Sequence, residues 1–224
     1  MLWLRTFYNL SSFFLGGFLG YGLIQIFLFN KSQQNAETKD ILKDDLFNEV
    51  KILCWIMISP KYHLTRGVHI KKTWGRKCNK LLFMSSEHDP VIDSIALPGM
   101  KEKITHLWSK TRKAFQLIHD EYLEEADWFL KADDDTYMIM ENLRQMLFQY
   151  NPKTALYLGQ RLISNESRDG FMQGGAYVLS KKAVKKFIKL YPNCRKKDGW
   201  AEDLYMGKKK IYDKILKRII KRAN

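Results

Sequence analysis

The chain has 224 residues, of which 46% are hydrophobic and 13% aromatic, so it suits one domain with appendages and a substantial core. Its formal net charge of +14 would fit nucleic acid or an acidic membrane surface. No zinc-finger spacing and no RNA-binding aromatic motif accompany that charge, which disfavours nucleic acid as a partner. Much of the basic charge lies in residues 181–197 and 208–222 and indicates a solvated basic face.

Residues 7–29 carry no charged side chain and are rich in Phe, Leu, Ile and Gly. At a rise of about 1.5 Å per residue, a helix of this length can cross a bilayer. We therefore predict a cytosolic tail over 1–6 and a transmembrane signal anchor over 7–29. Arg5 and the free amino terminus weakly favour a cytosolic N-terminus, with the bulk of the chain across the membrane. A cleaved signal peptide is the alternative, but the apolar run is long for that role.

The segment that follows, residues 30–49, is polar and is interpreted as a stem. A lumenal domain would place its cysteines in an oxidising compartment. The three cysteines allow one disulfide bond and leave one thiol over, and the sequence alone leaves the pairing open. They are Cys54, Cys78 and Cys194.

From residue 50 onward, predicted strands alternate with predicted helices. Apolar runs predict strands over 50–58, 81–84, 128–132, 157–159 and 176–179, and apolar spacing predicts helices over 64–74, 107–122, 143–150 and, after Ser180 as N-cap, up to residue 191. This alternation predicts an α/β fold with a mostly parallel sheet covered by helices. In such sheets, ligands bind beyond the carboxyl ends of the strands. There is no Walker A or GxGxxG fingerprint, which disfavours a P-loop or Rossmann domain.

Three consecutive carboxylates, Asp133, Asp134 and Asp135, directly follow the predicted strand 128–132. Adjacent anions are costly to bury unpaired, so this position suggests a compensating cation. Hard oxygen ligands suit Mg²⁺ or Mn²⁺, which commonly also hold substrate phosphates. In an extended segment Asp133 and Asp135 point to the same side, and Asp134 points elsewhere, toward a ribose hydroxyl. The alternative is a solvated acidic turn.

Two further motifs are candidates for chemistry. Gly174 and Gly175 precede the predicted strand 176–179 and permit unusual backbone angles or close approach to a ligand, although an ordinary turn explains them as well. Glu202 and Asp203 precede an apolar residue and favour a helix N-terminus. In a metal-dependent transferase, one such carboxylate could instead deprotonate an acceptor hydroxyl.

Together these motifs resemble the inverting β-1,3-glycosyltransferases of glycosyltransferase family 31. The resemblance covers about residues 50–207, and the predicted anchor fits the family's type II membrane topology. The stretch through Tyr137 is highly specific. The matching motifs, in the family's order, are 52–57, 73–74, 76–80, 82–87, 126–137, 174–175 and 202–204.

The resemblance implies a GT-A fold and transfer of galactose from UDP-galactose to the 3-hydroxyl of GalNAc on Ser or Thr of glycoproteins. It implies Mn²⁺ as cofactor, with Asp133 and Asp135 as metal ligands, and Asp203 as catalytic base. It also implies a Golgi membrane location with the catalytic domain in the lumen. The residues that would bind the metal–nucleotide donor are Lys131, Asp133, Asp134, Gly174 and Gly175.

The partners implied by the resemblance are a membrane, a GalNAc-bearing glycoprotein acceptor, a second copy of the chain in a homodimer, and a dedicated chaperone. Two other functions stay open. The chain could be a non-catalytic relative that acts as chaperone or partner of an active enzyme, against which the intact acidic triplet argues. It could also be a related β-1,3-glycosyltransferase that uses another donor sugar.

The sequence departs from the family after residue 204. Family enzymes continue with a histidine that completes the metal site, an aromatic acceptor region and a paired-cysteine motif. The chain ends at Asn224, so we expect a glycosyltransferase domain over 50–207 that is incomplete at its C-terminal end, and a basic tail over 208–224. The family also has a cysteine where this chain has lysines at 208–210. The resemblance therefore implies that Cys194 lacks its partner and that Cys54 pairs with Cys78.

Overall fold

The computed structural model describes residues 25, 28–29, 45–164, 167–190 and 198–206. The chain divides into two units, Met1–Leu46 and Phe47–Asn224, and the fold lies in the second. The predicted cytosolic tail and basic tail, nearly all of the predicted anchor and most of the predicted stem fall outside the described residues, as does Cys194. Within the described part of the chain, no helix has the length and apolarity needed to cross a membrane.

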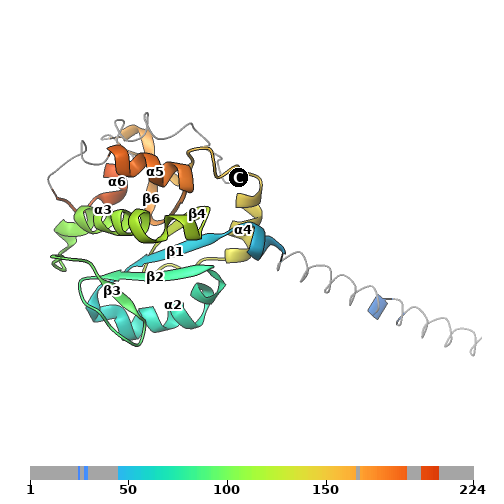
Figure 1. Ribbon diagram of the computed structural model, residues 1–224, viewed down its shortest axis with the longest axis horizontal. Coiled ribbons are helices and arrows are strands. Elements are labelled where there is room, and N and C mark those ends of the chain that lie inside the picture. The colour runs from blue at the N-terminus through green and yellow to red at the C-terminus, as the bar shows by residue number, and fades with distance from the viewer. Residues whose placement is uncertain (1–24, 26–27, 30–44, 165–166, 191–197, 207–224) are drawn as a thin grey trace, which may run out of the picture. The chain divides into compact units, whose positions relative to one another are not determined.

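A six-stranded sheet with the order β3-β2-β1-β4-β6-β5 forms the centre of the fold (Figure 1). β2 pairs in parallel with β1 and β3, and β1 pairs in parallel with β4. β6 runs antiparallel to both β4 and β5. The predicted mostly parallel sheet is confirmed, with an antiparallel edge that the sequence did not reveal. The strands are β1 Ile52–Met57, β2 Lys80–Ser85, β3 Ser94–Ala96, β4 Trp128–Asp133, β5 Tyr157–Ser164 and β6 Ser167–Ser180.

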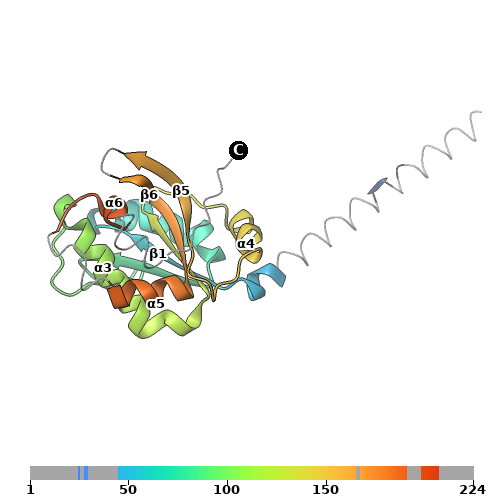
Figure 2. The same cartoon turned by 90° about the horizontal axis from the view of Figure 1, so that it is seen from above.

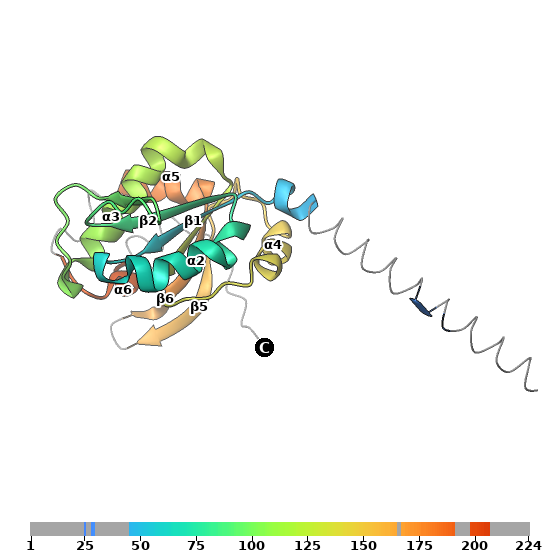
Figure 3. The same ribbon diagram turned by 90° about the horizontal axis from the view of Figure 1, so that it is seen from below.

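Helices cover both faces of this sheet, with α3 and α5 on one face and α2 on the other (Figure 3). The α-helices are α2 Val68–Lys72, α3 Leu107–Leu117, α4 Met140–Phe148, α5 Lys181–Leu190 and α6 Glu202–Met206. Short 3₁₀ and π segments extend or connect them: η1 Pro60–Tyr62, η2 His63–Gly67, η3 Trp74–Lys77, η4 Ile104–His106, η5 Ile118–Tyr122 and η6 Leu123–Glu125.

The strands β1 and β4 are the innermost of the parallel strands, and every residue of β1 is buried. Strands covered on both faces are continuous apolar runs, which is why residues 50–58 and 128–132 were predictable. On the α3 and α5 face, edge-to-face contacts join Trp55, Phe115 and Phe187 with ring centroids 5.2 Å apart in each pair. This aromatic core fixes α3 and α5 against the sheet.

Most predicted helices are confirmed, with two refinements. Ser180 caps α5 as predicted, since its hydroxyl oxygen accepts the Ala183 N–H at 3.2 Å. In α4, Leu143 and Leu147 are buried and Met146 is 40% exposed, so the covered stripe of this helix is narrower than its apolar spacing.

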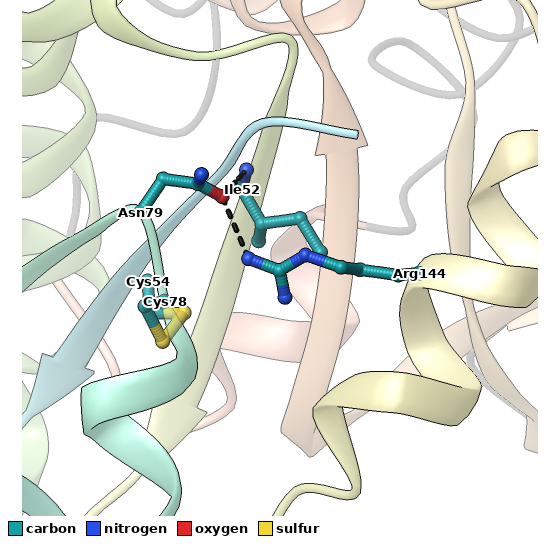
Figure 4. The surroundings of a disulfide bond; sticks show 5 residues. All are labelled: Ile52, Cys54, Cys78, Asn79 and Arg144. Atoms are coloured by element: carbon teal, nitrogen blue, oxygen red, sulfur yellow. Dashed lines mark hydrogen bonds between the residues drawn. A yellow bond between two sulfur atoms is a disulfide. The ribbon is translucent and has the colours of Figure 1, made fainter. Parts of the chain in front are cut away.

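A disulfide bond joins Cys54 of β1 to Cys78, just before β2. The pairing implied by the family resemblance is therefore confirmed. Beside it, Asn79 Oδ1 accepts the Ile52 N–H at 2.8 Å and a guanidinium N–H of Arg144 at 2.7 Å (Figure 4). Arg144 comes from α4 and is buried, and this burial lowers its pKa to about 10. These contacts lock the amino ends of β1 and β2 together.

Candidate functional site

A cavity of about 490 Å³ opens at the carboxyl ends of β1 and β4. Its floor is polar, and its rim includes exposed apolar side chains of Ile104 and Trp200. The position agrees with the general rule for ligand sites in open α/β sheets. All the predicted site residues line it except Gly175; those that do are Lys131, Asp133, Asp134, Asp135, Gly174 and Asp203.

The acidic triplet spans the end of β4 and the turn after it. Asp133 closes the strand, with an oxygen 2.6 Å from the Lys131 ammonium. Asp134 accepts a hydrogen bond from Arg66 of η2, whose guanidinium also lies 3.9 Å from Asp135. Asp135 is the most exposed of the three, at 68%. All three carboxylates thus meet cations of the protein itself, Asp135 at the longest distance, and Arg66 was not predicted from the sequence.

Lys131 is the centre of this site. Its side chain is 1% exposed, and its ammonium meets Asp133 Oδ1 at 2.6 Å, Glu202 Oε1 at 3.0 Å and the carbonyl oxygen of Gly174. The ammonium donates hydrogen bonds to Asp133 and Gly174, and its contact with Glu202 is an ion pair. Its predicted contact with the donor substrate stays a prediction.

The two glycines lie within β6 and not in a turn, so the turn interpretation is wrong. Gly174 donates its N–H to Asp203 Oδ2 at 3.1 Å. A Cβ at residue 174 would come within 3.3 Å of both Asp203 Oδ2 and Glu202 Oε1, so only glycine allows this approach without displacing a carboxylate. The carbonyl oxygen of Gly175 accepts the Thr136 hydroxyl at 2.9 Å, which fixes the turn after the triplet against β6.

Glu202 and Asp203 begin α6, as their sequence pattern predicted. Glu202 is buried, and its Oε2 accepts the hydroxyls of Tyr177 at 3.0 Å and Thr111 at 3.3 Å. Asp203 lines the cavity, and its two oxygens accept the N–H groups of Gly174 and Leu204. Glu202 lines the cavity too, but it is buried, whereas Asp203 is half-buried, and the sequence could not assign this difference to two adjacent acids.

Burial sets the electrostatics of the floor. It raises the pKa of Asp133 to about 6, although the Lys131 ammonium opposes the shift. Burial opposes a charged Lys131, but Glu202 and Asp133 outweigh it and raise the lysine's pKa. Burial and the neighbouring Glu202 keep the pKa of Tyr177 well above its usual value. The floor therefore holds a charged lysine and a carboxyl group at Asp133 that titrates in the mildly acidic range, and the protonated hydroxyl of the buried Tyr177 contacts Glu202.

A second buried lysine, Lys110 of α3, also lines the cavity. Its ammonium donates to the Ile58 carbonyl at 2.6 Å and to Glu102 at 2.8 Å, and burial lowers its pKa. The Arg66 guanidinium lies 3.9 Å from the ring centroid of Tyr62, another lining residue. Sequence reasoning missed these side chains because their partners lie in other elements.

The carboxylates present fit a hard divalent cation. Mg²⁺ and Mn²⁺ are commonly held by one or two carboxylates together with diphosphate oxygens and water. Asp133 and Asp135 both line the cavity, and they lie close enough for Asp135 to contribute to the raised pKa of Asp133. Among the residues described, no three His, Cys, Asp or Glu side chains form a metal-binding group. A cation here would thus rely on substrate and water oxygens for its remaining ligands.

A mixed α/β sheet with a carboxylate-lined cavity at its carboxyl edge fits a GT-A-like fold. The model of the Fringe-like family matches residues 44–210. The chain therefore belongs to the Fringe-like family, in agreement with the resemblance inferred from its motifs.

Curated relatives carry names of several sugar transferases. The chain is 44% identical over 148 residues to glycoprotein-N-acetylgalactosamine 3-beta-galactosyltransferase 1 of Xenopus laevis, which covers 66% of this chain and 41% of that protein. It is 28% identical over 175 residues to human chondroitin sulfate synthase 3, and this match covers 68% of this chain and 19% of that protein. It is 23% identical over 170 residues to mouse beta-1,3-glucosyltransferase, and this match covers 75% of this chain and 33% of that protein. The chain thus spans less than half the length of each of these relatives.

Proposed function

We propose that this chain is a core 1 β-1,3-galactosyltransferase that transfers galactose from UDP-galactose to the 3-hydroxyl of GalNAc on Ser or Thr of glycoproteins, with inversion. The observation that carries the proposal is the single cavity that brings the acidic triplet and Asp203 together. The 44% identity to a galactosyltransferase that acts on glycoprotein N-acetylgalactosamine supports the donor and the acceptor.

In this reaction Asp203 is the catalytic base. Its carboxylate takes the proton from the acceptor's 3-hydroxyl as that oxygen attacks the anomeric carbon of galactose, and UDP departs from the opposite face. The N–H groups of Gly174 and Leu204 hold the carboxylate in one orientation, at 3.1 and 2.7 Å. Bringing the two sugars together in a fixed geometry supplies much of the acceleration.

Asp133 and Asp135 are the residues that would hold a Mn²⁺ ion in this proposal. When bound, the ion supplies positive charge that stabilises the departing UDP diphosphate. Lys131 orients the Asp133 carboxylate from below, and Arg66 orients Asp134. Because these carboxylates are already oriented before the donor binds, less reorganisation of the site is needed on binding.

The proposal includes a type II Golgi membrane protein, anchored by residues 7–29, whose catalytic domain faces the lumen. The apolar character of that segment supports the anchor. The Cys54–Cys78 disulfide supports an oxidising compartment, because such bonds are rare in the cytosol.

The test is transfer by the full 224-residue chain in detergent, with a peptide that carries GalNAc on Thr as acceptor. We expect a galactose-containing product with UDP-galactose and Mn²⁺, and loss of that product when the metal is chelated. A panel of UDP-glucose, UDP-N-acetylglucosamine and UDP-galactose distinguishes the donors. A preference for another sugar would replace the proposed donor. No transfer despite Mn²⁺-dependent UDP binding would favour a non-catalytic partner of an active enzyme.

A further inference from the structure

One buried ammonium connects the two halves of the candidate site. Lys131 of β4 contacts Asp133, the carboxylate on the metal side, and Glu202, the neighbour of the base. It also donates to the carbonyl oxygen of Gly174, whose own N–H binds Asp203. Three elements, β4, β6 and α6, therefore meet at one nitrogen atom.

We propose that Lys131 and Glu202 are positioning residues that couple cation and nucleotide binding at Asp133 to the placement of the base Asp203. This inference rests on the proposed function. In this inference Lys131 acts by positioning protein carboxylates, and it does not contact the donor substrate directly. Neither residue touches the reacting sugars in this assignment.

The coupling follows from shared charge. In the absence of a divalent cation, Lys131 divides its attraction between Asp133 at 2.6 Å and Glu202 at 3.0 Å. A divalent cation bound to Asp133 partly neutralises that carboxylate. The Lys131 ammonium is then attracted less strongly to Asp133, and Glu202 becomes its main anionic partner. The attraction that holds the start of α6 then strengthens when the donor binds. The coupling also acts in the other direction. Without the charge of Glu202, the Lys131 ammonium binds Asp133 more strongly and competes with the divalent cation for that carboxylate, so cation-dependent nucleotide binding weakens.

An ion pair that served stability alone would not require one ammonium to contact residues of three different elements. Buried pairs are often replaceable by apolar residues without loss of stability, so stability alone explains such a pair poorly. Here the Lys131 ammonium contacts a cavity carboxylate, the strand β6 and the first residue of α6 at the same time. Glu202 is also secured by Tyr177 and Thr111, so the lysine is not its sole contact.

The first test needs no metal. The Gly174 amide proton, bound to Asp203 Oδ2, reports on the base, and its hydrogen exchange can be followed by NMR in the full chain in detergent. We expect exchange at Gly174 to accelerate about tenfold in Glu202→Gln, because a charge-assisted contact is lost beside it. Tyr177→Phe is the matched control, since it removes an uncharged hydrogen bond to the same carboxylate and keeps the Lys131–Glu202 pair. Exchange that is unchanged in Glu202→Gln, or equally fast in Tyr177→Phe, overturns the positioning role.

The second test measures UDP affinity by calorimetry with and without Mn²⁺, at a temperature where each variant is folded. We expect Glu202→Gln to weaken Mn²⁺-dependent UDP binding about fivefold to tenfold, and Tyr177→Phe to leave it within about twofold. Lys131→Met combined with Glu202→Gln removes both charges and is the variant to use if a single substitution prevents folding. In that double variant, a return of UDP affinity toward the wild-type value supports the competition between Glu202 and Asp133.

The outcomes separate the two proposals. If the wild-type chain binds no UDP in the presence of Mn²⁺, the proposed function is contradicted, and the Gly174 exchange still decides whether Lys131 and Glu202 place Asp203. If wild type binds UDP and Glu202→Gln binds it equally well, the coupling is overturned while the proposed function stands.

Discussion

Glu202 and Asp203 are adjacent in the chain and both line the cavity, yet their carboxylates have different partners. Glu202 is 3% exposed and contacts the side chains of Lys131, Tyr177 and Thr111. Asp203 lines the cavity and is held only by backbone N–H groups in the contacts described above. Glu202 is therefore held by three side chains, whereas Asp203 keeps the exposure that its proposed role as base requires.

Replacing the proposed base, Asp203, should separate nucleotide binding from sugar transfer. Asp203→Asn keeps the size of the side chain and removes its basicity, so we expect galactose transfer to fall at least about a hundredfold. Mn²⁺-dependent UDP binding should persist. Radiolabelled transfer and calorimetry measure the two effects. Asp93→Asn is a matched control, because Asp93 is exposed and its φ of 58° is well tolerated by asparagine. Full transfer by Asp203→Asn would contradict the assigned base.

The two glycines of β6 should respond differently to alanine. A Cβ at Gly174 meets Asp203 and Glu202 oxygens at 3.3 Å, whereas the nearest atom at Gly175 is 3.8 Å away. We expect Gly174→Ala to displace the base and reduce kcat about tenfold or more. Gly175→Ala should leave kcat close to wild type. Equal kcat values for the two variants would show that the close approach at Gly174 has no role.

Nucleotide binding should depend on pH through Asp133. Its pKa is about 6, and the protonated carboxyl is a poor metal ligand. We expect Mn²⁺-dependent UDP affinity to be constant well above pH 6 and to fall about tenfold per pH unit below it. Calorimetry across pH 5 to 8 measures this dependence. An affinity that holds steady down to pH 5 would remove Asp133 from the metal site.

The same group makes a prediction for stability, with the sign reversed. Its folded-state pKa lies above the ordinary aspartate value of 3.8, so protonation of Asp133 favours the metal-free folded state. That contribution is fully present below pH 3.8 and is lost as the pH rises through about 6. Urea unfolding of wild type and Asp133→Asn at several pH values isolates it. The difference between the two proteins should change over this window, and a constant difference would contradict the assignment.

The disulfide should contribute substantially to stability. Cys54 and Cys78 are 24 residues apart, and a loop of this size is expected to stabilise the fold by about 3 kcal/mol. We expect the double variant Cys54→Ser and Cys78→Ser to unfold at lower urea concentration than wild type. A reductant should destabilise wild type and leave the variant unchanged, which controls for effects at the remaining cysteine.

The Asn79–Arg144 contact offers an asymmetric test. Asn79→Ala leaves the buried Arg144 guanidinium and the Ile52 N–H without their shared acceptor, and we expect a loss of about 2 kcal/mol. Arg144→Met keeps much of the side chain's volume and removes the charge, so it should cost less. Urea unfolding of both variants measures the order. Arg144→Met as the more destabilising change would show that the guanidinium itself stabilises the amino end of β1.

The sequence predicted the sheet well where burial is uniform. Continuous apolar runs marked β1 and β4 because both faces of these strands are covered. β3 has three residues, Ser94–Ala96, and too little pattern to be detected. The first half of β6 lacks strand propensity and is extended because β5 pairs with it (Figure 2). Gly174 and Gly175 follow it, at the register shift between the pairs Arg161–Met172 and Gly159–Tyr177.

The site was predictable by residue type but not by orientation. The acidic triplet and Asp203 stood out because they follow or precede apolar residues. Arg66 did not, because its partner Asp134 is 68 residues away in the chain. Lys131 was visible as a charge in an apolar run, but only the fold reveals that Glu202 faces it from below. Contacts between distant segments depend on packing that a single sequence does not encode locally.

The central position of β1 has a consequence during biosynthesis. β1 is the first strand of the sheet to be synthesised. Its neighbour β4 begins at Trp128, which pairs with Ile52 of β1. At about 5–20 residues per second, roughly 4–15 s pass before that neighbour emerges. During this interval one edge of a wholly apolar strand is unpaired, a condition that promotes aggregation. Nascent chains of this protein should therefore depend on folding assistance more than a protein of similar size whose neighbouring strands follow one another directly.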